Sequence, residues 1–277
     1  MKTNRFTGPV QAALRQILAL VLSAAVIVPM YMVLVNSFKS RREGNLMRMT
    51  LPLEWHVENY ATVIEQGKLA SSFFNSCLYA FAGSGGVVFI AALGTWVLAR
   101  RTDRMAKGIY LFLIVGLFLP VNFVTLIKIM SAIGLYGTRV GMILYYLGDN
   151  AAFSVFVSYF YFGNIPRELD EAAVIDGVGP FRTFVSVIFP LLKPICVTVF
   201  VLTFIVIWSD FTTPLYLINK TSQWPMNLAI YNFFGRYSQQ WNLVFADIVL
   251  TALPVFFIYL ICQKQIVSGL TSGAVKG

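Results

Sequence analysis

The chain has 277 residues, of which 58% are hydrophobic and only 12% are charged, whereas charged residues make up about 25% of an ordinary soluble domain. A soluble domain of this size would need more polar surface, so the composition excludes that class. The net charge of +9 does not require a nucleic-acid partner, because basic residues of membrane proteins gather beside the spans. We therefore expect a chain in contact with membrane lipid and with no nucleic acid.

Six apolar runs are long enough to cross the hydrocarbon core as helices, which takes about 20 residues. In chain order they cover residues 17–38, 73–98, 109–129, 140–162, 195–218 and 244–261. The runs are continuous and lack the two-residue alternation of barrel strands. We predict an all-α integral membrane protein with six transmembrane helices, forming a single transmembrane domain over residues 1–277. The first run continues too far for a cleavable signal peptide and has no small-residue cleavage pattern before Pro29.

The distribution of Lys and Arg predicts the orientation of these spans. The side that would carry both termini holds twelve of them: Lys2, Arg5, Arg15, Arg100, Arg101, Arg104, Lys107, Arg167, Arg182, Lys193, Lys264 and Lys276. The other side holds nine: Lys39, Arg41, Arg42, Arg48, Lys68, Lys128, Arg139, Lys220 and Arg236. Since basic residues favour the cytoplasmic side, we expect the N- and C-termini in the cytoplasm.

The largest predicted cytoplasmic loop, residues 163–194, has the pattern of two short helices. Asn164 is a candidate N-cap, and Pro166 suits the first turn of a helix. Gly177 and Gly179 interrupt this helix, and Pro180 can begin the next one. Apolar residues then recur at helical spacing: Phe181, Phe184, Val185 and Ile188. The loop is either a solvated hairpin or an element that docks into a partner.

The sequence contains none of the common catalytic or nucleotide-binding motifs. It has no GxxxxGK[ST] loop, HExxH or GxSxG motif. The single histidine, His56, cannot make a metal site alone, and the three cysteines lie apart in apolar runs. We therefore expect no catalytic residues, no metal site and no cofactor bound by this chain, which argues against a membrane enzyme.

The loop at 163–194 resembles the EAA loop of the membrane subunits of bacterial ABC importers. The resemblance rests on Glu171-Ala172-Ala173, on Gly177 four residues later, and on Pro190. Further matching positions resemble the carbohydrate-importer branch, which includes the maltose-type permeases: Asp176, Phe184, Pro194, Trp208-Ser209-Asp210-Phe211, Pro214-Leu215, Gly269-Leu270-Thr271 and residues 273–277. Val187 and Phe189 depart conservatively from the usual pattern.

The resemblance implies a permease subunit of a binding-protein-dependent sugar importer in the bacterial cytoplasmic (inner) membrane. It implies four kinds of partner: a second similar permease subunit, two ATPase subunits, an external solute-binding protein and a saccharide. ATP and Mg would be bound by the ATPase subunits, so this chain itself would not be an enzyme. The EAA loop would lie between the fourth and fifth spans and form a coupling helix in the ATPase. Its expected coupling residues are Glu168, Asp170, Glu171, Ala172, Ala173, Asp176, Gly177, Phe184 and Pro190.

A second loop, residues 219–243, is expected on the external side. In maltose-type subunits a corresponding loop reaches into the binding protein, and its counterparts here match in position only: Asn219, Lys220, Thr221, Ser222 and Gln223. The alternative is an interfacial loop anchored by Trp224 and Trp241 at the level of the lipid headgroups.

Polar side chains inside the spans are candidates for the translocation path, because such groups are costly in lipid and usually functional. The candidates are Asp149, Asn150, Trp208, Asp210 and Tyr216. Hydrogen bonding between helices is an equally good explanation for the two aspartates. They would also suit an ion-coupled secondary transporter, although such a transporter would have no use for a coupling loop. The sequence leaves the saccharide open: a neutral sugar, an oligouronate and a sugar phosphate all fit.

Overall fold

The structure, a computed structural model, describes residues 9–233 and 240–274. The secondary structure within these residues is entirely helical, which confirms the all-α prediction. The α-helices are α1 (Pro9–Ser37), α2 (Arg41–Gly44), α3 (Glu58–Gln66), α4 (Leu69–Arg100), α5 (Arg104–Gly116), α6 (Phe123–Ala132), α7 (Arg139–Phe162), α8 (Glu168–Ile175), α9 (Pro180–Thr183), α10 (Phe189–Leu191), α11 (Lys193–Ser209), α12 (Thr212–Leu217), α13 (Met226–Ala229) and α14 (Trp241–Ala274). A π-helix, η1 (Phe184–Ile188), and two 3₁₀-helices, η2 (Thr221–Gln223) and η3 (Ile230–Phe233), complete the set. Residues 234–239 of the predicted external loop lie outside the described residues, as do residues 275–277 of the C-terminal segment that resembles the family.

The chain forms two compact units. The first unit comprises Met1–Leu69 and Ile230–Ala252, and the second comprises Ala70–Ala229 and Leu253–Gly277. The single transmembrane domain over residues 1–277 therefore remains a prediction about how the chain is organised in the membrane.

The first unit is held together by a buried asparagine on α3. The side-chain amide of Asn59 donates hydrogen bonds to the carbonyls of Ser37 at 2.8 Å and Lys39 at 2.9 Å, just after α1. Its oxygen accepts a hydrogen bond from Asn242 at the start of α14, at 2.9 Å. Buried polar groups need such partners, so one side chain ties three segments together.

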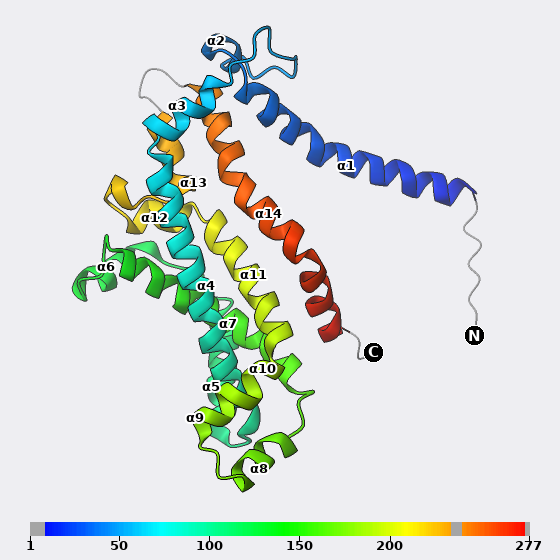
Figure 1. The fold of residues 1–277 in the computed structure, drawn as a ribbon, viewed down its shortest axis with the longest axis vertical. Coiled ribbons are helices and arrows are strands. Elements are labelled where there is room, and N and C mark those ends of the chain that lie inside the picture. The colour runs from blue at the N-terminus through cyan, green and yellow to red at the C-terminus, as the bar shows by residue number, and fades with distance from the viewer. Residues whose placement is uncertain (1–8, 234–239, 275–277) are drawn as a thin grey trace. The chain divides into compact units, whose positions relative to one another are not determined.

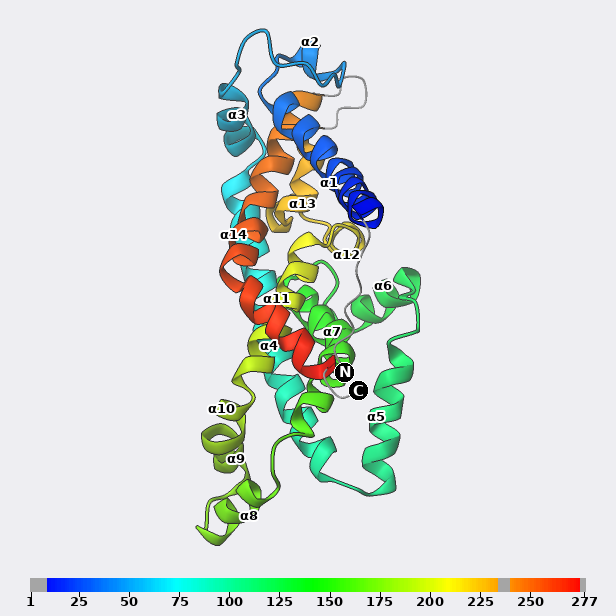
Figure 2. The same cartoon turned by 90° about the vertical axis from the view of Figure 1, so that its right-hand side faces the viewer.

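The second unit has an apolar core between α4, α7 and the segment from η1 to α11. Its buried members are Val87, Ala92, Phe162, Phe184, Ile188, Leu192, Ile195 and Val199. Three of them, Phe184, Ile188 and Leu192, come from the predicted coupling loop. In both views, α8, α9 and α10 lie at the end of α4 (Figures 1 and 2). The part of the predicted coupling loop from Phe184 to Leu192 is therefore packed into the apolar core of the second unit.

Four helices are long and apolar enough to cross a membrane: α1, α4, α7 and α14. A fifth span results if Pro180–Leu191 and Lys193–Ser209, which meet at 79°, count as one bent pair. The predicted number of six spans is not reached by continuous helices among the described residues. The coarser prediction of an α-helical chain with several membrane-crossing helices is confirmed.

The third predicted span, residues 109–129, is not the single helix that the sequence predicted. The structure ends α5 at Gly116 and begins α6 at Phe123, and Figure 2 shows the two as separate helices with a bend between them. Pro120 lies in the break, and a proline disfavours helical backbone at the preceding residue. The ten residues of α6 cover only about 15 Å at about 1.5 Å per residue.

The fifth predicted span, residues 195–218, also divides. α11 ends at Ser209, and Asp210 has extended backbone with ψ 122°. The carboxylate of Asp210 accepts a hydrogen bond from the backbone N–H of Thr213 at 3.1 Å, at the start of α12. Aspartate favours such capping over the interior of a helix, so the sequence itself contains the reason for the break.

Candidate functional site

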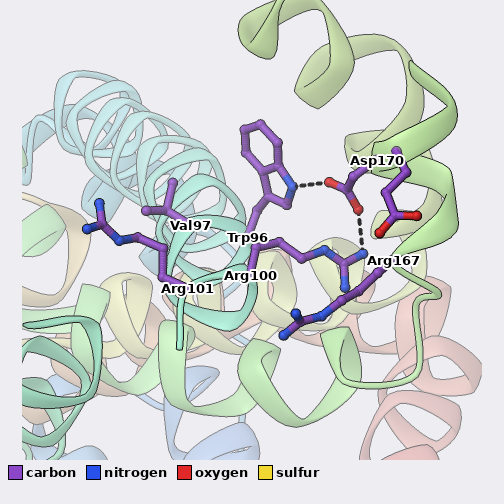
Figure 3. A pocket seen from close by; sticks show the side chains of 7 residues that line it. Trp96, Val97, Arg100, Arg101, Arg167 and Asp170 are labelled. Atoms are coloured by element: carbon purple, nitrogen blue, oxygen red, sulfur yellow. Dashed lines mark hydrogen bonds and ion pairs between the residues drawn. The ribbon is translucent and has the colours of Figure 1, made fainter. Parts of the chain in front are cut away.

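The end of α4 meets the first turn of α8 around the carboxylate of Asp170 (Figure 3). Nε1 of Trp96 donates a hydrogen bond to Oδ1 of Asp170 at 2.7 Å, and Nη2 of Arg100 lies 2.7 Å from Oδ2. Trp96 and Arg100 are four residues apart on α4, so they share one face of that helix. The side chains of Arg100 and Asp170 are only 18% and 20% exposed. We call Trp96, Arg100 and Asp170 the Asp170 cluster.

Arg100 also holds the segment that leads from α7 into α8. Its Nη1 donates to the carbonyl of Ile165 at 3.1 Å and its Nη2 to the carbonyl of Pro166 at 3.0 Å. The guanidinium carbon lies 4.4 Å from the centre of the Phe162 ring, at the end of α7. A planar guanidinium suits this combination of stacking and several directed hydrogen bonds, which an ammonium cannot reproduce. One side chain of α4 thus contacts α7, the connecting segment and α8.

These contacts explain why α8 begins later than predicted. The sequence predicted an N-cap at Asn164 with Pro166 in the first turn, but the structure begins α8 at Glu168. The carbonyls of Ile165 and Pro166 accept from Arg100 instead of from the helix. The predicted start was therefore wrong, because a distant side chain takes the acceptors on which a longer helix would depend.

The turn after α8 is where the sequence predicted it, at Gly177. The N–H of Gly177 donates to the carbonyl of Val174 at 3.0 Å, and the N–H of Val178 donates to that of Ala173 at 2.9 Å. Gly177 has φ +71°. This pattern is the Schellman motif, which places a left-handed residue directly after the helix. Glycine adopts that conformation without steric cost.

The remaining expected coupling residues on α8 differ in exposure. Ala173 is buried, whereas Glu168, Glu171, Ala172 and Asp176 are exposed. Large apolar side chains are exposed beside them: Val174 (71%), Ile175 (85%) and Phe181 (70%). Contiguous exposed apolar and acidic side chains are typical of a surface that another protein covers. We call the exposed residues Glu171, Val174, Ile175 and Phe181 the α8–α9 surface.

An open cleft of about 290 Å³ lies beside this surface, between the end of α4 and α8. It is lined by Trp96, Val97, Arg100, Arg101, Arg167, Asp170 and Glu171. Figure 3 shows Arg101 pointing away from Asp170. Arg101 pairs locally with Asp103, with Nη2 at 2.9 Å from Oδ2, and this hydrogen bonding lowers the pKa of that carboxyl. Arg101 and Arg100 are therefore adjacent arginines with different partners.

Phe184 and Pro190, two further expected coupling residues, have different positions. Phe184 is fully buried and stacks on Trp96 with ring centres 5.5 Å apart, whereas Pro190 is exposed in α10. The predicted apolar stripe divides in the same way: Phe184 and Ile188 face the core, and Phe181 and Val185 are exposed. The buried ring of Phe184 thus anchors the loop to α4 through Trp96.

The other expected contact segment, residues 219–223, is fixed through its backbone. The side-chain amide of Asn75 donates to the carbonyls of Ser222 at 3.0 Å and Trp224 at 3.1 Å. Tyr79 donates to the carbonyl of Gln223 at 2.9 Å. Arg139 donates to the side-chain oxygen of Asn75 at 3.0 Å and to the carbonyl of Ser222 at 3.3 Å. The side chains of Asn219, Lys220, Thr221 and Ser222 are left exposed.

Two long helices connect these two regions. Asn75 and Arg100 lie near opposite ends of α4, and Arg139 and Phe162 lie at opposite ends of α7. At about 1.5 Å per residue, the two members of each pair are about 35 Å apart along the helix axis. That separation exceeds the hydrocarbon core of about 30 Å, so the Asp170 cluster and the segment at 219–223 lie at opposite ends of membrane-length helices.

Two of the candidates for the translocation path, Asp149 and Asp210, lie close enough to interact electrostatically. Tyr146 donates a hydrogen bond to Oδ2 of Asp210 at 3.1 Å, and Tyr145, whose ring contacts that of Tyr146, interacts with the exposed Asp149 on α7. Asn150 donates to the carbonyl of Tyr146 in its own helix at 3.0 Å.

The two aromatic candidates have different partners. Trp208 is buried and stacks on Phe204, with ring centres 5.6 Å apart. Tyr216 is 46% exposed and stacks on Phe123 at 4.6 Å. Among the described residues, no group of three or more His, Cys, Asp or Glu side chains could hold a metal ion.

Sequence reasoning missed the residues that position both regions: Asn75, Tyr79, Trp96, Arg100 and Arg139. Arg100 was interpreted only as one of the basic residues that set orientation. The spacing of Trp96 and Arg100, with two hydrogen-bonding side chains one turn apart at the end of an apolar run, was the only available signal. It does not identify Asp170 as their partner.

Known proteins resemble this chain over most of its length. Residues 67–271 match the family described as "Binding-protein-dependent transport system inner membrane component". The chain is 34% identical over 269 residues to the probable starch degradation products transport system permease protein AmyC of Thermoanaerobacterium thermosulfurigenes, covering 96% of this chain and 98% of the relative. It is 32% identical over 270 residues to the diacetylchitobiose uptake system permease protein NgcG of Streptomyces coelicolor, covering 96% and 89%.

A third relative and a solved structure extend the comparison. The melibiose/raffinose/stachyose import permease protein MelC of Bacillus subtilis is 29% identical over 264 residues, covering 94% of this chain and 95% of the relative. A chain in the crystal structure of a bacterial ABC transporter involved in the import of the acidic polysaccharide alginate superposes with a TM-score of 0.82. That match covers 95% of this chain and 99% of the other at 18% identity, so it supports the fold alone.

Proposed function

The chain belongs to the family of binding-protein-dependent transport system inner membrane components, and from this premise we propose that it is the permease subunit of an ABC importer for an oligosaccharide. The three relatives are named for starch degradation products, for diacetylchitobiose, and for melibiose, raffinose and stachyose. What these substrates share is a short chain of linked sugars. The proposed cargo class is therefore a neutral oligosaccharide.

The α8–α9 surface carries this proposal. Glu171, Val174, Ile175 and Phe181 are exposed together, while Phe184 and the Asp170 cluster fix the same segment to the body of the second unit. An exposed apolar surface on a firmly held element favours transmission of force from a docked protein. The proposed partner here is a pair of ATPase subunits, which bind ATP and Mg and hydrolyse the nucleotide, while this chain performs no hydrolysis. Glu168, Ala172 and Asp176 would complete the docking face.

The proposed orientation places α8 and both termini in the cytoplasm and the segment at 219–223 outside. The side chains from Asn219 to Ser222 are exposed, and their backbone is fixed from α4 and α7. A rigid backbone with free side chains suits contact with an external solute-binding protein. A second, similar permease subunit would complete the pathway.

We propose that the translocation path runs beside the break between α11 and α12. Asp210 accepts hydrogen bonds from the backbone N–H of Thr213 and from Tyr146, and polar groups at helix breaks are where transporters commonly bind solute. Asp149, exposed on α7, is the second proposed polar contact. Asn150 bonds within its own helix and Trp208 is packed in the interior, so both have structural explanations.

The test is to reconstitute this chain in proteoliposomes with the second permease subunit, the ATPase subunits and the solute-binding protein. Maltotriose, diacetylchitobiose and raffinose are the probes. ATP-dependent uptake of at least one probe, absent without the ATPase subunits, is the expected result. Uptake by this chain without ATPase, driven by an ion gradient, would replace the proposal with a secondary transporter.

A substitution at Glu171 tests the proposed coupling role separately. Glu171→Lys reverses the charge on the α8–α9 surface and is expected to weaken ATPase binding at least about tenfold, the loss expected from one charge-assisted contact. Glu65→Lys makes the same change on the exposed face of α3 and is the matched control. Equal ATPase affinity for both variants would contradict docking at Glu171.

A further inference from the structure

The acidic residues at the start of α8 fall into two groups that the sequence does not distinguish. Asp170 is 20% exposed in its side chain and bound by Trp96 and Arg100, whereas Glu171 is exposed. Successive residues of a helix point about 100° apart. Fixing the direction of Asp170 therefore fixes the direction of Glu171.

The contacts of Asp170 restrict the rotation of α8. Trp96 donates a hydrogen bond to one oxygen of the Asp170 carboxylate, and Arg100 forms an ion pair with the other, at 2.7 Å each. Arg100 meanwhile holds the carbonyls of Ile165 and Pro166 just before α8. A helix held both at its entry and at its first turn cannot rotate about its axis without breaking these hydrogen bonds and the ion pair.

We propose that Arg100 is a positioning residue for ATPase coupling, which acts through Asp170 to direct the Glu171 side chain toward the docked partner. Arg100 ends a helix of membrane length, and Phe162, which it covers, ends another. A movement of α8 imposed by the partner would therefore pass directly to α4 and α7. The inference rests on the proposed coupling function.

The test measures the affinity of purified ATPase subunits for the detergent-solubilised pair of permease subunits. Arg100→Gln removes the ion pair and the fork of donors, and a loss of affinity of about tenfold is expected from one lost charge-assisted interaction. Arg100→Lys keeps the charge without the fork and is expected to restore only part of the affinity. Arg101→Gln is the matched control, because Arg101 pairs with Asp103 in an exposed position.

A double variant distinguishes positioning from a general loss of stability. If Arg100 acts through Glu171, Arg100→Gln adds no further loss of affinity to Glu171→Lys, because the aimed side chain is already ineffective. If Arg100 only stabilises the fold, the two losses multiply and the melting temperature falls with them. Multiplied losses, or wild-type affinity in Arg100→Gln, would overturn the inference. Failure of the wild-type pair to bind ATPase would instead overturn the proposed function.

Discussion

The turn at Gly177 allows a quantitative test of how the coupling segment is built. Gly177 has φ +71°, and a non-glycine residue pays about 1–2 kcal/mol to adopt left-handed backbone. A Cβ at this position would meet nothing within 4 Å. The energetic cost of Gly177→Ser therefore comes from the backbone conformation alone. Gly179→Ser, the same substitution two residues later, is the control.

Gly179 is the natural comparison. It precedes α9 with φ −67° and ψ 156°, extended backbone that any residue adopts, and a Cβ there also meets nothing within 4 Å. Serine is a favoured residue at the position before a helix. Gly179→Ser is thus expected to leave the turn intact, and Gly177→Asn to lie between the two serine variants because asparagine tolerates the left-handed region.

Hydrogen exchange of the peptide that covers residues 168–183 measures the opening of this turn directly. A cost of about 1–2 kcal/mol corresponds to exchange about five to thirty times faster in Gly177→Ser. Gly179→Ser is expected to exchange at the wild-type rate. Equal protection in the two serine variants would refute the assignment of the left-handed residue to Gly177.

Two further predictions concern the buried asparagines Asn75 and Asn59. Asn75→Ala removes the donor for the carbonyls of Ser222 and Trp224 and is expected to destabilise their loop by about 1–3 kcal/mol, seen as faster hydrogen exchange in residues 219–226. Ser222→Ala, which keeps its carbonyl, is expected to change nothing. Asn59→Ala leaves two carbonyls of the first unit without their donor. It is expected to lower the free energy of unfolding by about 2–4 kcal/mol, which a lower melting temperature would show. Thr62→Ala on the same helix is the control, with an expected loss of about 0.5 kcal/mol.

The long helices were largely predictable because each is a continuous apolar run. α4 and α7 begin and end within a few residues of the predicted spans, whereas α1 begins at Pro9 instead of residue 17 and α14 continues to Ala274 instead of ending at residue 261. Two predicted spans are wrong because a single residue breaks the helix within an otherwise apolar run. Pro120 interrupts the third run and Asp210 the fifth, and neither lowers the mean hydropathy enough to divide its run.

The coupling segment was predictable where its geometry depends on its own residues. The turn at Gly177 follows from local backbone chemistry, and the structure has it there. The late start of α8 was not predictable, because it depends on Arg100, which lies more than sixty residues earlier in the chain. The contacts by which Asn75 and Tyr79 anchor residues 222–224 cross an even longer separation in sequence.

The neighbouring acids Asp170 and Glu171 show why composition alone cannot identify a docking surface. Both favour the first turn of a helix through its dipole, so the sequence groups them together. The fold separates them, because α4 presents an indole N–H and a guanidinium to one face of α8 and nothing comparable to the next. The first acid becomes an internal anchor and the second remains available to a partner. Under the proposed coupling role, a substitution at either position would reduce coupling, but only at Glu171 would the loss come from a contact with the proposed ATPase partner.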